Sequence, residues 1–408
     1  MKYIKRHLER KFIKMNDFFK AVLVTGARQA GKTTMLKHLA EGKNYTYVNL
    51  DNSAVRILAQ SDPALFFQTY KPPILIDEIQ KAPGLLEQIK IMCDESEETG
   101  RFWLTGSRQF KMMENVRETL AGRVGILNLY SLSQTEKAGV CFENDLDFTY
   151  DCFKTRRKYM PKNSIMNVYE HIWRGGMPSI VSADPEEMRV YFDSYLDTYV
   201  IRDAVEDGGI TDVVRYRKFI TACAAITGGI VNYATLAEGA GISQPTAREW
   251  LSLLEGMNIV FLLPPYSNNA LKRLVKAPKL YFCDTGLAAH LSLWLTPETL
   301  MNGAAAGRFY ENYVVSELFK YYSYSPVKAA LSYYRDSNVK EVDILIEANN
   351  FVHPIEIKRA ASPNPREVKK FALFEKAGVQ TGPGGIICMC EDAIPIDAQN
   401  CFIPSNLL

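Results

Sequence analysis

The sequence lacks the features that mark membrane, secreted and zinc-binding proteins. No apolar stretch approaches the roughly 18 residues that a membrane-spanning helix requires, so no membrane association is expected. The eight cysteines are scattered, and none of them shows the C-x-x-C spacing of a zinc site. The apolar residues of Met1–Lys20 recur at the spacing of an amphipathic helix, which argues against a targeting segment. Reduced cysteines and a cytoplasmic location follow as expectations.

The chain also has little net charge, +2 over 408 residues. Because the field of the whole chain is weak, any affinity for nucleic acid must arise from local basic patches. The composition, with 47% hydrophobic and 23% charged residues, is that of a folded globular protein and not of a disordered one. The length is too great for one ordinary core and predicts two to four domains.

Four zones differ in their residue patterns. Residues 1–145 alternate short apolar strands with helices, which predicts an α/β domain with a parallel sheet covered by helices. Residues 146–208 open with a basic run and continue helically, as a connector or lid would. Residues 209–300 are helical and end in two strand-like runs, Ile259–Leu263 and Lys279–Cys283. Residues 304–400 form a helix and then several strands, which predicts a second α/β domain.

The clearest motif lies between an apolar strand at 21–25 and a helix at 33–40, and it fits G-x-x-x-x-G-K-[ST]. Glycines let successive backbone N–H groups close around phosphates at a helix start, where the helix dipole adds positive charge. Lys32 is expected to reach the β- and γ-phosphates, and the Thr33 hydroxyl to bind Mg²⁺. The expected nucleotide-binding residues are Gly26, Ala27, Arg28, Gln29, Ala30, Gly31, Lys32, Thr33 and Thr34.

Two carboxylates complete the predicted site. The apolar strand Ile74–Ile76 ends in Asp77 and Glu78. Asp77 is expected to hold Mg²⁺ through water, and Glu78 to orient and deprotonate the attacking water. A further strand, Phe102–Thr105, is followed by Gly106-Ser107, which would place Thr105 or Ser107 near the γ-phosphate. The alternative is a hydroxyl that only caps the next helix.

These motifs, followed by Leu120-Ala121-Gly122-Arg123, resemble those of AAA-type ATPases. More narrowly, the chain is similar to a bacterial and archaeal family in which such an ATPase precedes a C-terminal domain of unassigned function. The resemblance implies ATP and Mg²⁺ as cofactors, with a homo-oligomer as one expected form. It also makes Arg123 the candidate for a nucleotide-sensing or finger arginine, a role that accelerates hydrolysis about 10³- to 10⁵-fold in related systems. The alternative is a surface arginine.

Tyr233–Leu251 is typical of a helix, a tight turn and a second helix, with Ser243 as a natural N-cap. The two later strand-like runs would make this region a winged helix. The expected wing carries four cations: Lys272, Arg273, Lys276 and Lys279. This pattern favours DNA as a partner, read by Gln244, Thr246 and Arg248. Winged helices also serve as lids and oligomer contacts, so that alternative stays open.

The last zone holds an acidic constellation: Glu311 on a helix, Asp343 on a strand, and Glu356-Ile357-Lys358 on the next strand. Three acids around one metal ion, with a lysine near the attacking water, suit phosphodiester hydrolysis. Glu311, Asp343 and Glu356 are the predicted metal ligands, and Asp343, Glu356 and Lys358 the predicted catalytic residues. The pattern resembles the restriction-endonuclease-like fold and predicts weak metal-dependent cleavage of nucleic acid. The alternative is a set of solvated charges on an α/β domain.

Taken together, these motifs predict an ATPase whose turnover is coupled to a nucleic-acid-associated C-terminal module. The rival hypothesis is an ATP-gated switch that binds DNA or protein and carries a catalytically inactive nuclease-like domain. A third hypothesis is an ATPase that acts on a protein partner, with the wing as an assembly contact.

Overall fold

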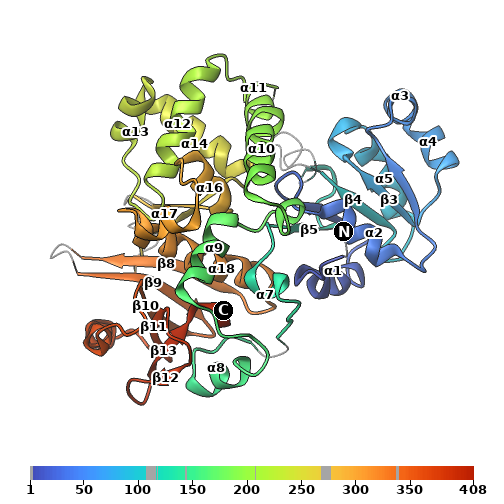
Figure 1. Ribbon diagram of the computed structural model, residues 1–408. Helices are drawn as coiled ribbons and strands as arrows, with labels where there is room; N and C mark the ends of the chain where they lie inside the picture. Colours follow the sequence, from blue (N-terminus) through green and yellow to red (C-terminus); the bar gives the residue numbers. More distant parts are fainter. Residues whose placement is uncertain are drawn as a thin grey trace. The chain divides into compact units, whose positions relative to one another are not determined.

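The structure is a computed structural model that describes residues 3–106, 116, 118–142, 145–206, 208–267, 277–336 and 340–408. Its internal contacts divide the chain into two compact units. Unit 1 comprises Met1–Leu132 with Gly256–Asn258, and unit 2 comprises Ser133–Glu255 with Ile259–Leu408. Ser107 and the wing residues Lys272, Arg273 and Lys276 lie outside the described residues. Figure 1 follows the chain from blue to red through both units.

Unit 1 is built on a five-stranded parallel sheet in the order β2-β3-β4-β1-β5. The strands are β1 (Ala21–Thr25), β2 (Thr46–Asn49), β3 (Ile74–Asp77), β4 (Phe102–Thr105) and β5 (Val124–Asn128). The helices named in this unit are α1 (Leu8–Asn16), α2 (Lys32–Ala40), α3 (Ser53–Ser61), α4 (Pro63–Thr69) and α5 (Leu85–Asp94), with a 3-10 turn η1 (Ile79–Lys81). The predicted α/β domain with a parallel sheet is therefore confirmed.

The central strands are short and apolar because helices cover both faces of the sheet. Every residue of β1, β3 and β4 is buried, as expected of inner strands of a parallel sheet. Helix α1 packs against β1 and β5, and Phe12 on α1 meets Trp103 of β4 edge to face. The Trp103 indole N–H donates to Asn16 Oδ1 at 2.6 Å. The N-terminal helix is thus an integral part of unit 1.

Unit 2 opens with helices. They are α7 (Gln134–Lys137), α8 (Tyr150–Arg156), α9 (Ile165–Arg174), a 3-10 turn η2 (Pro178–Ile180), α10 (Pro185–Tyr195), a π-helical segment η3 (Leu196–Ile201), α11 (Arg202–Glu206), α12 (Val213–Ala225), α13 (Tyr233–Ala240) and α14 (Gln244–Gly256). The antiparallel pair β6 (Val260–Leu263) and β7 (Lys279–Phe282) follows, and Ile230 forms a bridge with Lys279. The predicted strand-like runs after the helices are present.

The C-terminal part of unit 2 is a six-stranded mixed sheet in the order β12-β13-β11-β10-β9-β8. The strands are β8 (Ala329–Arg335), β9 (Glu341–Ala348), β10 (Phe351–Lys358), β11 (Gly384–Cys388), β12 (Ile394–Pro395) and β13 (Asn400–Pro404). The remaining helices are α16 (Thr285–Leu291), α17 (Pro297–Asn302), α18 (Ala306–Tyr324), the 3-10 segments η4 (Pro365–Phe371) and η5 (Ser405–Leu407), and α19 (Ala372–Lys376). Strands β8, β9 and β10 are antiparallel neighbours, whereas β11 runs parallel to β10.

The basic run near residue 154 has a structural use. The guanidinium of Arg156 is buried and donates to the Leu407 carbonyl at 3.0 Å. Lys162 pairs with Glu391 at 3.0 Å and with Asp392 at 2.8 Å. These cations bind the C-terminal segment of the same unit and neutralise its acids.

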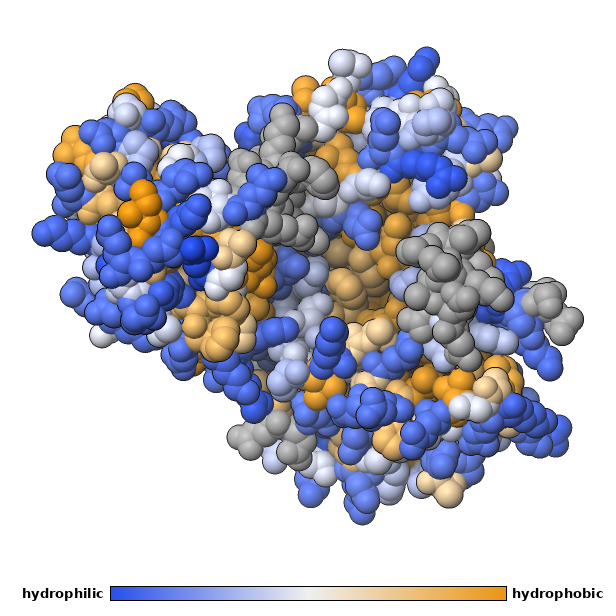
Figure 2. All heavy atoms as spheres, turned by 180° about the vertical axis from the view of Figure 1, so that it is seen from behind, coloured by the Kyte–Doolittle hydropathy of each residue, from blue (hydrophilic) through white to orange (hydrophobic). Residues whose placement is uncertain are grey.

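Hydrophilic side chains cover most of the face shown in Figure 2, with apolar residues visible between them.

The 19-residue helix α18 carries Arg308, Glu311, Glu317 and Lys320. Among the helices that the structure describes, none is both long and apolar enough to cross a membrane.

Asn312 joins α18 to β7. Its fully buried side chain donates to the Phe282 carbonyl at 2.9 Å and accepts the Phe282 N–H at 2.9 Å. The Thr227 hydroxyl also donates to its Oδ1. A side-chain amide that matches both backbone groups of one strand residue fixes the helix against the strand.

We predict that Asn312→Leu lowers the free energy of unfolding of unit 2 by at least about 2 kcal/mol, because it leaves both Phe282 backbone groups buried without that partner. Thermal and urea denaturation measure the loss. Asn302→Leu, at an exposed position of α17, is the control and should change little. Equal stability of the two variants would contradict this role for Asn312.

Candidate functional site

The predicted phosphate loop connects β1 to α2 in unit 1. Gly26 has φ +138°, and a Cβ at this position would lie 2.1 Å from the Leu129 carbonyl oxygen, so only glycine fits. Gly31, with φ +95°, turns the chain into α2. The buried Lys32 ammonium donates to the Gly26 and Ala27 carbonyls at 3.0 and 2.9 Å. The lysine therefore lies across its own loop, as the motif requires.

The other predicted loop residues are arranged around this frame. Ala27 and Ala30 are buried, Arg28 is half-buried, and Gln29 is exposed with φ +60°. Thr34 is exposed on the first turn of α2. The loop thus presents both buried backbone and exposed side chains at the carboxyl end of β1.

The Asp77 carboxylate is contacted by side chains from several elements of this unit. One of its carboxylate oxygens, Oδ1, accepts the Thr33 hydroxyl at 2.8 Å and also the Thr105 hydroxyl. The other, Oδ2, accepts the Tyr47 hydroxyl at 3.1 Å. The structure therefore brings together the predicted magnesium residues Thr33 and Asp77 and places the predicted Thr105 beside them.

Tyr47 was missed by the sequence analysis. Its ring lies under the Lys37 ammonium, which is 3.8 Å from the ring centroid. Partial burial, followed by the charge of Asp77 and the hydrogen bond to it, raises the pKa of Tyr47, so its hydroxyl stays a proton donor. The only sequence signal for Tyr47 was its position two residues before the end of β2. That strand pairs with β3, with Asn49 opposite Asp77.

Glu78 follows Asp77 in a left-handed backbone conformation, with φ +61° and ψ +46°. Non-glycine residues in this region carry strain that surrounding contacts must hold. The Glu78 N–H donates to the Thr105 hydroxyl at 3.2 Å, and its carboxylate accepts from the Gln80 amide. The turn at Glu78 is thus held by Thr105 of β4 and by Gln80.

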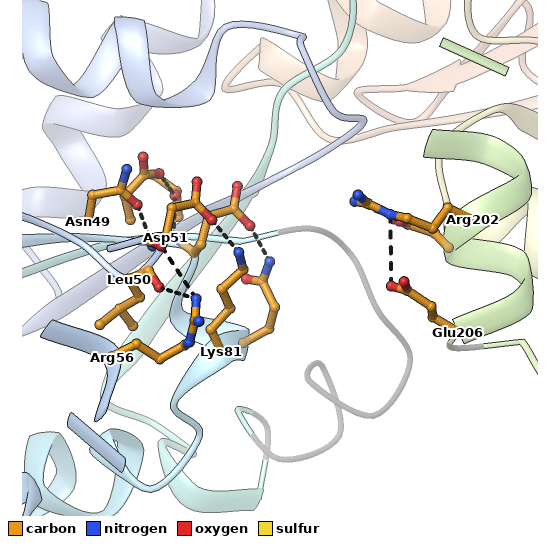
Figure 3. Close-up of polar contacts among 12 residues, drawn as sticks. Asn49, Leu50, Asp51, Arg56, Lys81, Arg202 and Glu206 are labelled. Atoms are coloured by element: carbon orange, nitrogen blue, oxygen red, sulfur yellow. Dashed lines mark hydrogen bonds and ion pairs between the residues drawn. The ribbon is translucent and has the colours of Figure 1, made fainter. Parts of the chain in front are cut away.

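Figure 3 shows the polar contacts that hold the segment after β2. Lys81 pairs with Asp51, and Arg56 donates to the Leu50 and Asp51 carbonyls at 3.2 and 3.4 Å. These bonds tie the start of α3 to the turn that follows Glu78. The other labelled pair belongs to unit 2: Arg202 and Glu206 of α11, at 3.8 Å.

Arg123 is not brought to the phosphate loop. It precedes β5, and its carbonyl accepts the Ala21 N–H at the start of β1. Because β1 and β5 are parallel, Arg123 lies at the edge of the sheet opposite the loop, which follows the end of β1. Its guanidinium pairs with both Asp94 oxygens, at 2.6 and 3.0 Å. A sensing role at the site of its own chain is therefore wrong; a finger that acts on a neighbouring subunit stays a prediction.

The unit 1 residues fit a magnesium nucleotide. The loop is shaped by a glycine that no other residue can replace, and it carries a buried cation. Thr33 and Asp77 supply oxygen ligands of the kind that Mg²⁺ prefers. When bound, Mg²⁺ would neutralise the phosphate charge that develops in hydrolysis. Lys32 would bind phosphate, and Glu78 would accept the proton of the attacking water.

In unit 2, Glu311 of α18 belongs to an ion-pair network. The Lys279 ammonium lies 3.0 Å from Glu311 Oε1 and 2.6 Å from Glu341 Oε1. The Tyr281 hydroxyl donates to the same Glu311 oxygen at 2.6 Å. Burial raises the pKa of Glu311, Lys279 opposes this rise, and the charge of Asp343 adds to it. Lys279 was assigned to the phosphate-contacting wing, but it is buried; that assignment is wrong.

Glu356 of β10 has two lysine partners. Lys358 Nζ lies 2.5 Å from Oε1, and Lys370 Nζ lies 2.5 Å from Oε2. Burial, and then the charge of Asp343, raise the pKa of Glu356 to about 7. Asp343 Oδ2 accepts the Ile357 N–H at 2.8 Å. The predicted residues are thus close enough to influence each other electrostatically.

Each predicted ligand of the second cluster already has a protein donor: Glu311 and Glu356 pair with lysines, and Asp343 accepts a backbone N–H. Consistently, the described part of the chain contains no group of three or more His, Cys, Asp or Glu side chains arranged to hold a metal ion. Metal binding by Glu311, Asp343 and Glu356 therefore stays a prediction.

Three family models match consecutive parts of the chain. An AAA domain matches residues 18–138, and two domains of unknown function match residues 166–298 (DUF8612) and 306–408 (DUF4143). The phosphate loop, Asp77 and Glu78 lie inside the first match. Family match and site geometry together define an AAA-type ATPase domain.

Curated relatives extend the similarity to most of the chain. Uncharacterized proteins of Mycobacterium tuberculosis and Mycobacterium bovis are each 27% identical over 389 residues, which cover 94% of this chain and 80% of theirs. Among solved structures, a Walker-type ATPase of Pyrococcus abyssi is 13% identical, with 71% of this chain and 96% of that chain covered and a TM-score of 0.44. A RuvB variant of Thermotoga maritima is 19% identical over 66% of this chain and 91% of that chain, with a TM-score of 0.28. At these TM-scores the structural similarities add nothing to the assignment.

We predict that Glu78→Gln retains ATP binding but lowers the hydrolysis rate at least about 100-fold, because an amide cannot accept the proton of the attacking water. Lys32→Ala should instead lose ATP binding, since it removes the buried cation of the loop. Titration calorimetry and single-turnover phosphate release separate the two effects. The exposed Lys71→Ala serves as control. Normal turnover by Glu78→Gln would show that another group is the base.

Proposed function

We propose that the chain is an ATP-hydrolysing enzyme that couples nucleotide turnover to a nucleic-acid-associated module in unit 2. The observation that carries the ATPase half is the convergence of Thr33, Tyr47 and Thr105 on Asp77, next to Glu78 and the phosphate loop. The family match to an AAA domain supports the same activity. ATP and Mg²⁺ are the proposed cofactors.

The order of elements from α12 to β7 supports a winged helix. Three helices are followed by an antiparallel strand pair, and Ile230, between the first two helices, bridges to β7. Helix α14 would be the recognition helix. Gln244 and Arg248 are exposed at its start, and the Arg248 guanidinium lies 4.0 Å above the Tyr233 ring. An exposed arginine stacked on an aromatic ring is suited to contact phosphate or a base.

The C-terminal sheet supports a restriction-endonuclease-like fold. Helix α18 precedes three antiparallel strands, and β11 then joins β10 in parallel after the η4–α19 segment. Asp343 and Glu356 lie on the neighbouring strands β9 and β10, with Lys358 two residues after Glu356. This arrangement agrees with the acidic constellation expected from the sequence.

A second candidate is an ATP-gated switch whose nuclease-like domain binds but does not cleave. The specific observation in its favour is that lysines occupy the carboxylates: Lys279 pairs with Glu311, and Lys358 and Lys370 pair with Glu356. A divalent cation would have to displace or share these ammonium groups. Repeated, DNA-accelerated ATP turnover favours the coupled enzyme, whereas slow single cycles favour the switch.

We predict that duplex or single-stranded DNA changes the ATPase rate and that Arg248→Ala reduces this effect. If Arg248 contacts phosphate, the slope of log affinity against log salt should flatten by about 0.9 on duplex DNA. Arg189→Ala, at an exposed position of α10, is the matched control. An ATPase rate that no nucleic acid changes, together with absent DNA binding, would refute the coupling while leaving the ATPase intact.

The switch hypothesis predicts that the wild-type chain produces no nicking of plasmid DNA with Mg²⁺ or Mn²⁺ above that of Asp343→Asn, because Lys279, Lys358 and Lys370 neutralise the carboxylates that a metal needs. Gel assays of supercoiled plasmid, with and without ATP, measure it. Metal-dependent nicking that disappears in Asp343→Asn would overturn the binding-only hypothesis and restore the cleavage expected from the sequence.

A further inference from the structure

Arg6 is a buried arginine of unit 1 that neither the phosphate-loop motif nor the carboxylates account for. It lies just before α1 and is 3% exposed. Its Nη1 donates to the Ala30 carbonyl at 2.7 Å, and its Nη2 donates to the Tyr130 carbonyl at 2.6 Å. Burying a guanidinium costs free energy unless its N–H groups are hydrogen-bonded. The hydrogen bonds to the two carbonyls therefore indicate a specific role for this buried arginine.

Both carbonyls belong to segments that shape the phosphate loop. Ala30 is in the loop, directly before Gly31 and Lys32. Tyr130 follows Leu129, whose carbonyl packs against Gly26 at the other end of the loop. The segment after β5 thus supports the loop twice: directly at Gly26, and through the Arg6 guanidinium at Ala30.

The bond to Ala30 fixes a donor for phosphate. A trans peptide is planar, so the Ala30 carbonyl and the Gly31 N–H point in opposite directions. With the carbonyl held on Arg6, the Gly31 N–H is directed away from Arg6. In a phosphate-binding loop, successive N–H groups converge on the anion while carbonyls face the protein. A cation on the carbonyl also polarises the same peptide and strengthens its N–H as a donor.

Arg6 is itself held in place. Its backbone N–H donates to Glu9 Oε1 at 2.7 Å, and the Tyr3 hydroxyl donates to the same oxygen at 2.6 Å. The Tyr3 ring packs against the His38 ring of α2, tilted by 33° and with 4.0 Å between the ring centroids. Helix α1 is fixed to the sheet through Phe12 and Trp103. The guanidinium therefore rests on a rigid support.

We propose that Arg6 is a positioning residue of the nucleotide site: it orients the Ala30–Gly31 peptide so that the Gly31 N–H binds a phosphate shared by nucleoside di- and triphosphates. The proposal rests on the proposed ATPase function and adds a residue outside the motif. Because ADP and ATP both carry that phosphate, Arg6 contributes to binding in the ground state and in the transition state alike.

The test measures ADP binding by titration calorimetry, which reports the dissociation constant and the stoichiometry separately. ATP binding is measured in the Glu78→Gln background, and kcat and KM in the otherwise wild-type chain. Arg6→Ala should weaken ADP and ATP binding about 10- to 100-fold with unchanged stoichiometry. The kcat at saturating ATP should stay within about threefold of the parent, because uniform binding affects KM alone.

The nucleotide affinity of Arg6→Lys should be intermediate, since one ammonium cannot reproduce the planar fork that spans two carbonyls. Arg10→Ala, an exposed arginine on α1, should match the parent.

The proposal is overturned if folded Arg6→Ala binds ADP with the dissociation constant of the parent chain. It is also overturned if only the binding stoichiometry or the melting temperature falls, because a purely structural role would produce that result. If Arg6→Ala does not fold, Arg6→Lys decides: parental affinity overturns the proposal, and intermediate affinity supports it. Failure of the parent chain to bind ADP is a different result, because it would remove the ATPase function itself.

Discussion

The arrangement of the nucleotide site depends on one carboxylate, which accepts hydrogen bonds from hydroxyl groups on three other elements. Asp77 at the end of β3 binds Thr33 of α2, Tyr47 of β2 and Thr105 of β4. This convergence follows from the strand order, which puts β4 between β1 and β3, so that the carboxyl ends of all these parallel strands meet. The same strand end turns sharply at Glu78. The pairing of the strands thus brings Asp77 and Glu78 to the end of the sheet at which the phosphate loop begins.

The two carboxylate clusters differ in the charge of their partners, and this difference decides how easily a metal enters. The partners of Asp77 are neutral hydroxyls, whose oxygens keep lone pairs and are themselves metal ligands. The partners of Glu356 and Glu311 include lysine ammonium groups. At the effective dielectric of a partly buried site, two unit charges about 4 Å apart interact with an energy of about 4 kcal/mol. A divalent ion entering the second cluster must overcome that repulsion, whereas one entering the first meets no cation among the partners of Asp77 described above.

The sequence predicts what is encoded locally and fails where distant segments meet. The phosphate loop, the Asp77-Glu78 strand and the parallel sheet are patterns of adjacent residues, and they were found. For Arg123, the motif gave the order of residues but not the edge of the sheet at which the residue lies, so its distance from the loop of its own chain could not be predicted. Lys279 was counted as a wing cation because it follows three basic residues, although its neighbours are Glu311 and Glu341, far along the chain. Arg6 left no signal at all, since its acceptors are backbone carbonyls and any residue type supplies those.

The segment that follows β5 is held by contacts at both of its ends. Leu129 is packed against Gly26 and bonded to Thr25, so this residue follows the phosphate loop. A few residues later, Ser133 and Glu136 form a capping box, and the Gln134 N–H donates to Glu317 of α18 at 2.7 Å. Within unit 2 that end of the segment is therefore fixed as well. The segment after β5 therefore has one end fixed by contacts within unit 1 and the other fixed by contacts within unit 2 to α18, the helix that carries Glu311 and Asn312. Only the few residues between Leu129 and Ser133 separate the two sets of contacts.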